Sequence, residues 1–409
     1  MISLREALEL IEAHAKPLPS VRLPLEAVHG KVLADPLVAS QDIPLFTQSA
    51  VDGYAVFAAD TVSAVEGLPI RLRISGMVRA GQYESPSQPL RGAIKIFTGG
   101  KLPRGADAVL MKEAVREEGD SILVTRPVAE GENVRYRGEE FRRGAVVFPA
   151  GARITPPVLG LLAGFGRAHV RVHRAPTVTL AVTGDELIPP GTRLRRGQIY
   201  DSNSLALSAA IQEFGLEPPT ILHLRDDRDA TREALGSALE DSDVLITVGG
   251  ISVGDYDLVK EALSELEVKT IYWRLAIKPG MPNYFGVRRK FRHSHLVFGL
   301  PGNPVAALLS FHQLVKPALA RLRGYRRESP VSISARLARE ARKKPGRMEW
   351  VRARLREERG ELVASPLEGQ GSHMLGGLAE ANCLIRFPLE EDRLEEGAKV
   401  EVELLSWRD

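Results

Sequence analysis

The chain is nearly devoid of cysteine, and this excludes several kinds of chemistry. Cys383 is the single cysteine among 409 residues, so neither an internal disulfide nor a zinc or iron–sulfur site made of several thiolates can form. Its apolar neighbours Leu384 and Ile385 favour a small buried residue in a strand over a catalytic thiol, because free cysteine packs as a small hydrophobe.

The sequence also lacks a long apolar run and a marked excess of charge. No uninterrupted apolar run approaches the roughly 18 residues that a membrane helix needs. The first residues carry acidic side chains among apolar ones and have neither the basic nor the continuously apolar segment of a secretion signal. The formal charge is +3, from 55 basic and 52 acidic residues, which is too small an excess to steer nucleic acid. We therefore expect a cytoplasmic protein that binds neither membrane nor nucleic acid.

Residues 176–327 alternate short apolar runs with amphipathic stretches, which is typical of βαβ units and a mainly parallel sheet. This pattern predicts strands at 178–182, 220–224, 244–248 and 295–298. It predicts helices at 205–214, 229–239, from about 258, and at 305–320. Ligands of such sheets bind beyond the carboxyl ends of the strands, so we expect the functional site in the loops that follow them.

The part before this region shows two different patterns. Ser3 and Glu6 match a capping box that begins a first helix, and a second helix is predicted at 156–163. Short alternating segments with Gly and Pro between them favour a β-rich insert at 50–135. The residues on either side of the insert, 1–49 and 136–175, would then form one discontinuous N-terminal domain.

Residues 328–409 return to short strands, for example at 331–333 and 400–404, which favours a small β-barrel. The predicted fold class is therefore a multidomain α/β protein. It has a central βαβ domain, a discontinuous N-terminal domain, an all-β insert and a C-terminal β-barrel.

Acidic residues follow three of the predicted strands of the central domain. They lie in the segments 183–187, 225–227 and 249–257, and the last of these begins with Gly249-Gly250. Glycine lets the backbone approach a ligand closely, and free amides before a helix favour an oxyanion such as phosphate. The carboxylates would repel phosphate unless a hard cation such as Mg²⁺ lay between them. Each loop alone is equally well explained as a tight turn with a capping aspartate, but three at one edge favour a site.

Two further loops add donors and rigid backbone. The segment 273–280 contains Arg274 and Lys278, which could neutralise phosphate charge, and ends on Pro279-Gly280. The segment 300–304 opens the last helix, with Asn303 as an N-cap and Pro304 at the first helical position. Composition and periodicity alone thus predict an α/β enzyme that binds a phosphorylated ligand with help from a metal.

Six motifs occur in the order and approximate spacing of the MoeA and gephyrin E-domain family, which the chain resembles over nearly its whole length. The C-terminal Gln370-Gly371-Ser372-His373 also fits the family. The motifs are Ser49 to Ala55, Thr98 to Val109, Thr183 to Leu187, Gly249 to Asp257, Lys278 to Gly280 and Leu300 to Pro304.

The resemblance implies a molybdopterin molybdenumtransferase that acts in molybdenum cofactor biosynthesis. Such an enzyme exchanges the adenylate of adenylylated molybdopterin for molybdate and releases AMP, with Mg²⁺ as cofactor. The resemblance further implies a central domain like that of the MogA and MoaB proteins. It also implies an elongated homodimer whose N-terminal part closes the other subunit's cleft, and transient contacts with an adenylyltransferase and with apo-molybdoenzymes.

The resemblance also assigns residues to roles. The metal would be held by some of Glu186, Asp226, Asp255 and Asp257. The catalytic set would be Asp52, Thr98, Arg135, Glu140, Glu186, Asp226, Asp257 and Lys278. The substrate would be bound by Thr183, Gly184, Asp185, Gly249, Gly250, Ser252, Gly254, Asp255, Arg274, Pro301, Gly302, Asn303, Pro304, Arg352 and Ser372.

Two positions depart from the family pattern. The family's Gly-Glu-Asp appears here as Gly138-Glu139-Glu140, so the last carboxylate sits on a longer side chain. Met281 stands where the family has a lysine, which removes one anion contact. Two other functions share parts of this pattern: a molybdopterin adenylyltransferase, and a scaffold protein of the gephyrin type.

Overall fold

A computed structural model of the chain describes residues 1–82, 86–87, 89–250, 258–290, 293–326 and 332–405. The chain divides into two compact units. The larger unit contains Met1–Asp35, Ala150–Leu159 and His169–Asp409, and the smaller unit contains Pro36–Pro149 and Gly160–Ala168. Helix α2 (Pro156–Gly164) contributes residues to both.

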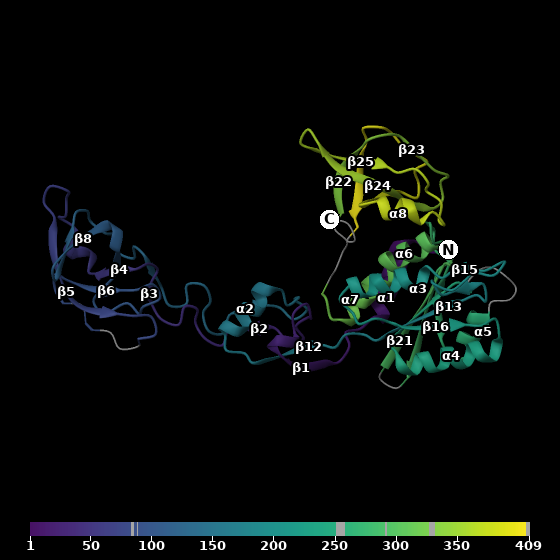
Figure 1. Cartoon of the computed structure of the whole chain (residues 1–409), viewed down its shortest axis with the longest axis horizontal. Helices are drawn as coiled ribbons and strands as arrows, with labels where there is room; N and C mark the ends of the chain where they lie inside the picture. The colour runs from purple at the N-terminus through teal and green to yellow at the C-terminus, as the bar shows by residue number, and fades with distance from the viewer. Residues whose placement is uncertain (83–85, 88, 251–257, 291–292, 327–331, 406–409) are drawn as a thin grey trace. The chain divides into compact units, whose positions relative to one another are not determined.

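The larger unit is built on a six-stranded sheet (Figure 1). Its strands are β13 (Val178–Thr183), β16 (Thr220–Leu224), β17 (Val244–Val248), β18 (Lys269–Trp273), β20 (Tyr284–Lys290) and β21 (His293–Leu300). The order across the sheet is β16-β13-β17-β21-β20-β18. The first four strands are parallel, and β20 is antiparallel to both of its neighbours. The predicted parallel strands are confirmed, whereas the antiparallel β20 was not predicted.

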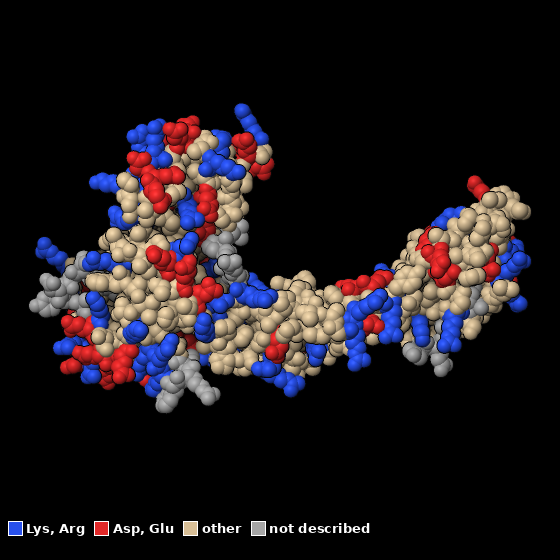
Figure 2. Space-filling view, turned by 180° about the vertical axis from the view of Figure 1, so that it is seen from behind, with Lys and Arg blue, Asp and Glu red and all other residues tan. Residues whose placement is uncertain are grey.

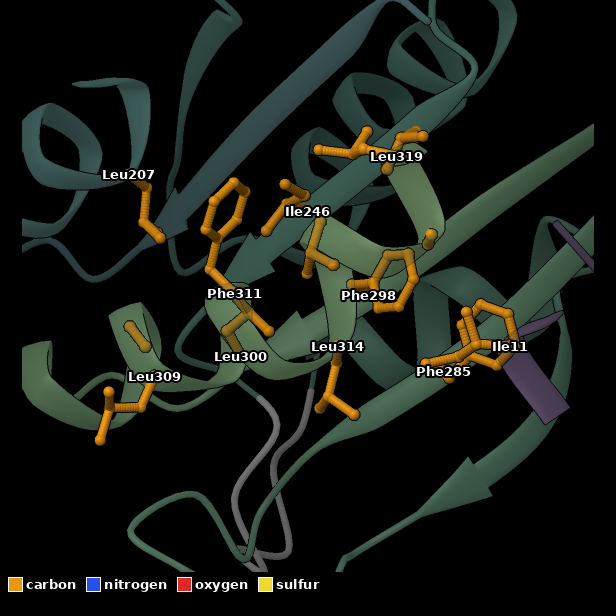
Figure 3. Close-up of a cluster of buried hydrophobic side chains, with 14 of the residues drawn as sticks. Ile11, Leu207, Ile246, Phe285, Phe298, Leu300, Leu309, Phe311, Leu314 and Leu319 are labelled. Carbon is orange, nitrogen blue, oxygen red and sulfur yellow. The ribbon is translucent and has the colours of Figure 1, made fainter. Parts of the chain in front are cut away.

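Helices cover both faces of this sheet, as Figure 1 shows. One face packs on α4 (Arg228–Asp241) and α5 (Leu258–Glu265). The other packs on α1 (Leu4–His14), α3 (Asn203–Glu213), α6 (Pro304–Ser310) and α7 (Lys316–Leu322). The core on this second face contains Ile246, Phe285 and Phe298 from the sheet (Figure 3). Burying a side chain of this size contributes about 1.5–3 kcal/mol, so this face anchors the unit.

The capping box predicted for α1 is present. The Ser3 hydroxyl accepts from the Glu6 N–H at 3.2 Å, while the Glu6 carboxylate accepts from the Ser3 N–H at 2.7 Å. The helix buries Ala7 and Ile11 against the core. The N-terminal residues are therefore a structural part of the larger unit.

The helix predicted at 305–320 is present and contains one irregular turn. A π-helical turn, η4 (Phe311–Val315), separates α6 from α7. Pro317 follows the turn, and a proline inside an α-helix has no N–H to donate and clashes with the carbonyl four residues earlier. The wider π-turn lets the helix pass the proline without ending.

The C-terminal part of the larger unit is a closed barrel, as predicted. Its strands are β22 (Ser332–Leu337), β24 (Met348–Glu358), β25 (Glu361–Pro366), β26 (Cys383–Phe387) and β28 (Lys399–Leu404). The pairing β24-β25-β22-β28-β26 closes because β26 also pairs with β24. Cys383 is fully buried in this barrel, and burial raises the pKa of its thiol to about 12, which confirms a packing residue.

The smaller unit is β-rich, as predicted for the insert. Its main sheet has the order β7-β4-β6-β5-β9-β8. The strands are β4 (Gly53–Val56), β5 (Ile70–Val78), β6 (Gly92–Ile96), β7 (Ala108–Met111), β8 (Val115–Glu118) and β9 (Ser121–Val124). Two short pairs, β2 (Leu37–Val38) with β11 (Val146–Phe148) and β3 (Gln48–Ser49) with β10 (Val134–Arg135), join its entering and leaving segments.

In the larger unit, a further pair is formed by β1 (Ser20–Pro24) and β12 (His169–His173). Among the described residues, no helix is both long enough and apolar enough to cross a bilayer. The boundaries proposed above for the individual domains stay predictions.

Candidate active site

The carboxyl ends of the parallel strands lie at one edge of the sheet, which we call the rim. Thr183 at the end of β13 is in register with Leu224 at the end of β16. Val248 at the end of β17 is in register with Val182 and with Leu300 of β21. The loops that carry the predicted acidic and glycine-rich motifs therefore begin next to one another, as the sequence pattern predicted.

The glycines after β17 allow a close approach of backbones at the rim. Gly249 and Gly250 have φ of +80° and +64°, a region that L side chains rarely adopt. A Cβ on Gly249 would lie 2.7 Å from the Thr183 hydroxyl oxygen, and one on Gly250 would lie 2.8 Å from a Val259 methyl. A Cβ on Gly302 would lie 3.8 Å from the Gly249 Cα. Glycine is thus required at 249 and 250 by space and conformation, and the backbones of these residues and of Gly302 line the rim without side chains.

The loop after β13 turns back on itself and carries two exposed carboxylates. Gly184 has φ of +130°, and a Cβ on it would overlap with the Glu186 carboxylate. The Leu187 N–H donates to the Gly184 carbonyl at 3.1 Å, which fixes the turn. Asp185 and Glu186 are exposed, and so is Asp226 after β16. These acids are therefore available to a cation or a ligand from two adjacent strands.

The loop before α6 is held from two sides. The Asn203 side-chain amide donates to the Gly302 carbonyl at 2.7 Å, and the Val305 N–H donates to the Ser372 carbonyl at 3.1 Å. Asn303 occupies the N-cap position with Pro304 after it, but its side chain makes no capping bond. The predicted N-cap position is therefore confirmed, without a side-chain capping bond. Asn203 was missed as a site residue, although its place in the cap-rich stretch 201–204 was a signal.

Arg352 is buried beneath the loop that carries Ser372. Its side chain is 1% exposed. Its guanidinium donates to the carbonyls of Gly369 at 2.6 Å and Gly371 at 3.1 Å and to the Gln370 side-chain oxygen at 3.3 Å. Arg352 therefore fixes the position of this loop. It would affect a bound ligand only indirectly, by positioning the loop.

Two cations predicted to neutralise phosphate lie on the strand-to-turn element after β18. Lys278 is about half exposed, and its Nζ lies 2.9 Å from a carboxylate oxygen of Glu349 on β24. Arg274 stacks on the Trp273 ring at 4.6 Å and has a left-handed φ of +75°. A left-handed arginine is strained by about 1–3 kcal/mol, and such strain is concentrated at functional sites. Glu349 was not predicted, because its partner is distant in the sequence.

The smaller unit contains the remaining described candidates. Asp52 accepts hydrogen bonds from the Thr98 N–H at 2.7 Å and the Thr98 hydroxyl at 2.8 Å. These bonds hold the pKa of Asp52 below its usual range, so it is a carboxylate at neutral pH. Arg135 and Glu140 are exposed and line one cavity of about 540 Å³ together with Gln48 and Asp42. The structure thus pairs Asp52 with Thr98 and places Arg135 and Glu140 in the lining of one cavity.

Four of the predicted residues lie outside the described part of the chain: Ser252, Gly254, Asp255 and Asp257. Among the residues that are described, no group of three or more His, Cys, Asp or Glu side chains is arranged to hold a metal ion. Glu186 and Asp226 nevertheless supply carboxylates from adjacent strand ends. This fits Mg²⁺, which needs one or two protein carboxylates and takes its other ligands from phosphate and water.

The surface charge is mixed. Figure 2 shows basic and acidic side chains interspersed over the face that it draws, in line with the near balance of 55 basic and 52 acidic residues. Local donors rather than a strong field of one sign must therefore select the ligand.

Family models match three segments of the chain. The MoeA N-terminal region (domain I and II) matches residues 2–166, a probable molybdopterin binding domain matches residues 179–321, and the MoeA C-terminal region (domain IV) matches residues 334–405. The chain is also 33% identical to a molybdopterin molybdenumtransferase of Haemophilus influenzae, over 98% of both chains. The chain belongs to the MoeA family.

Other relatives agree with this assignment. A molybdopterin molybdenumtransferase of Staphylococcus aureus is 30% identical over 95% of this chain and 91% of its own. A crystal structure of the molybdopterin biosynthesis moeA protein of Pyrococcus horikoshii OT3 superposes with a TM-score of 0.84 at 31% identity, covering 99% of this chain and 100% of that one. The resemblance inferred from the six motifs and the predicted fold class are confirmed.

Proposed function

We propose that this protein inserts molybdate into adenylylated molybdopterin and releases AMP, as a transferase of molybdenum cofactor biosynthesis. The observation that carries the proposal is the match to a molybdopterin molybdenumtransferase over 98% of both chains. The match extends over nearly the whole length of both chains.

The geometry of the rim supports the proposal. A diphosphate needs hydrogen-bond donors and positive charge, and the backbone at Gly249, Gly250 and Gly302 lines the rim without side chains. The loop before α6 precedes a helix N-terminus, which favours an anion. Lys278 and Arg274 add cationic groups from the neighbouring turn. Together these residues would orient the diphosphate and neutralise charge on the leaving phosphoryl group.

We further propose that Mg²⁺ is held by Glu186 and Asp226, together with Asp255 or Asp257. When bound, the cation would neutralise the diphosphate oxygens. If this is right, chelation with EDTA abolishes AMP release and added Mg²⁺ restores it, and Asp226→Asn raises the Mg²⁺ concentration needed for half-maximal rate. AMP release that is unchanged in EDTA would contradict a metal role. Calorimetric titration of the chain with Mg²⁺ provides a readout independent of turnover.

The residues of the smaller unit are proposed to act on molybdate. Molybdate is a dianion, so Arg135 and the Thr98 hydroxyl are suitable donors to it, while Asp52 fixes the orientation of Thr98. Glu140 lines the same cavity as Arg135, where it is suited to position water. A homodimer is part of the proposal, and sedimentation equilibrium of the full chain tests it.

Purified protein with adenylylated molybdopterin, Mg²⁺ and molybdate should release AMP, and omission of molybdate should stop the release. Asp257→Ala should abolish it without unfolding the chain. The adenylyltransferase alternative predicts instead that the protein consumes ATP and adenylylates free molybdopterin. The scaffold alternative predicts neither reaction, so the two assays together separate all three functions.

A further inference from the structure

A second polar cavity of about 250 Å³ lies in the larger unit, away from the rim. Its walls come from the turn at 29–32, from β12 and from the ends of α3 and α7. Helices α3 and α6–α7 begin after the carboxyl ends of β13 and β21, so their C-terminal ends lie toward the opposite end of the sheet. The cavity therefore lies toward the amino ends of the parallel strands, at the edge of the sheet opposite to the rim.

The lining of this cavity is strongly basic. Its charged and titratable side chains are His29, Lys31, Arg153, His173, Glu213 and Arg323. These side chains include three cations and one carboxylate, so the lining has a net positive charge even when both imidazoles are neutral. The His173 Nδ1 lies 2.7 Å from the Leu18 carbonyl, so this nitrogen carries a proton and the ring is held in place.

Arg323 forms a rigid part of the lining. It is 7% exposed, and its guanidinium donates to the Phe214 carbonyl at 2.6 Å and to the Gly30 carbonyl at 2.9 Å. Gly215 lies directly over it, since a Cβ on this glycine would be 3.7 Å from a guanidinium nitrogen. The buried charge is thereby fixed beside the cavity, between the two backbone segments that accept its hydrogen bonds.

Lys31 and Arg153 line the cavity together. They lie on two backbone segments that pair at Val32 and Arg153, so both are held near the cavity. Within the described residues, neither side chain has an ion-pair partner, although many other arginines and lysines do. Lys31 is half-buried and Arg153 is exposed, so both cations are accessible to an anion that enters the cavity.

We propose that this cavity binds a small inorganic oxyanion of the phosphate, sulfate or molybdate class. The volume is below the roughly 300–1,000 Å³ of pockets that enclose whole organic ligands, so a nucleotide or pterin does not fit. A tetrahedral oxyanion has enough acceptors for Lys31, Arg153 and one imidazole at once. Bound there, it would join the turn at 29–32 to the segment around Arg153.

The test must distinguish this site from the rim, which is also expected to bind oxyanions. Crystals grown without phosphate or sulfate are soaked in molybdate, and the anomalous scattering of molybdenum locates the anion. We expect a peak within contact of Lys31 and Arg153. The peak should be absent in the double variant Lys31→Gln/Arg153→Gln and retained in the control Lys16→Gln, which changes an exposed lysine outside the cavity.

Calorimetry of the full chain then measures affinity in solution. Each single variant, Lys31→Gln or Arg153→Gln, should weaken this binding by about tenfold or more, because a hydrogen bond to a charged group contributes a factor of that order. Lys16→Gln should leave it unchanged. The proposal is overturned if no peak forms in the cavity, if the double variant binds like the wild type, or if AMP displaces the anion more effectively than phosphate does.

Discussion

Replacing Gly249 by alanine tests whether the rim needs a bare backbone at this position. The new Cβ would occupy a residue with φ of +80° and lie 2.7 Å from the Thr183 hydroxyl oxygen. The left-handed conformation costs about 1–2 kcal/mol. Thr183 must also rotate and lose its hydrogen bond to the Val248 carbonyl, now 3.3 Å long, which costs about 1 kcal/mol more. We expect Gly249→Ala to lower the free energy of unfolding by about 2–3 kcal/mol.

Gly397→Ala is the matched control for this variant. Gly397 has φ of +79°, and nothing lies within 4 Å of the position of its Cβ. It should therefore show only the conformational cost of about 1–2 kcal/mol. Urea denaturation followed by tryptophan fluorescence measures both, since Trp273 and Trp350 lie in the larger unit.

Activity separates the two variants further. Gly249→Ala should reduce AMP release at least tenfold under conditions where the chain stays folded, while Gly397→Ala should retain it. The reasoning is refuted if the two variants lose the same stability and both keep full activity. A larger loss of stability in Gly397→Ala would refute it as well.

Three other outcomes are expected. Asp52→Ala should lower AMP release at least tenfold while pterin binding, measured by calorimetry, stays nearly intact; equal loss of both would assign Asp52 to binding. Arg352→Met leaves several loop carbonyls without their donor and should lower the free energy of unfolding by about 3 kcal/mol; thermal denaturation checks this, and an unchanged midpoint would contradict it. Burial raises the pKa of Asp243, but hydrogen bonds from Arg174 and Thr177 outweigh this and lower it. Asp243→Asn should therefore cost about 2 kcal/mol at pH 7, and urea titrations should show the cost shrinking as the pH falls below about 4.

Four strands of the central domain and its helices could be predicted to within a few residues, whereas the strands β18 and β20 were not predicted. The segments 220–224 and 244–248 are apolar runs between clear turn and cap residues, and they are the strands β16 and β17. Their parallel order then places the acidic loops at one edge, so the rim followed from the pattern as well.

Other features could not be predicted, either because they depend on packing or because they join elements that are distant in the sequence. The π-turn before Pro317 and the burial of Arg352 depend on local packing, which no periodicity reveals. The bond from Asn203 to Gly302 and the ion pair of Lys278 with Glu349 join separate elements. Sequence motifs predicted which loops form the site, but not which side chains hold those loops in place.

The proposed chemistry is tested most directly by counting both products of a single turnover. Full-length protein is mixed with adenylylated molybdopterin, Mg²⁺ and molybdate, and AMP is measured by chromatography while pterin-bound molybdenum is measured by mass spectrometry. The proposal predicts one molybdenum atom on the pterin for each AMP released. AMP formed without molybdenum on the pterin, or at the same rate without molybdate, would contradict it.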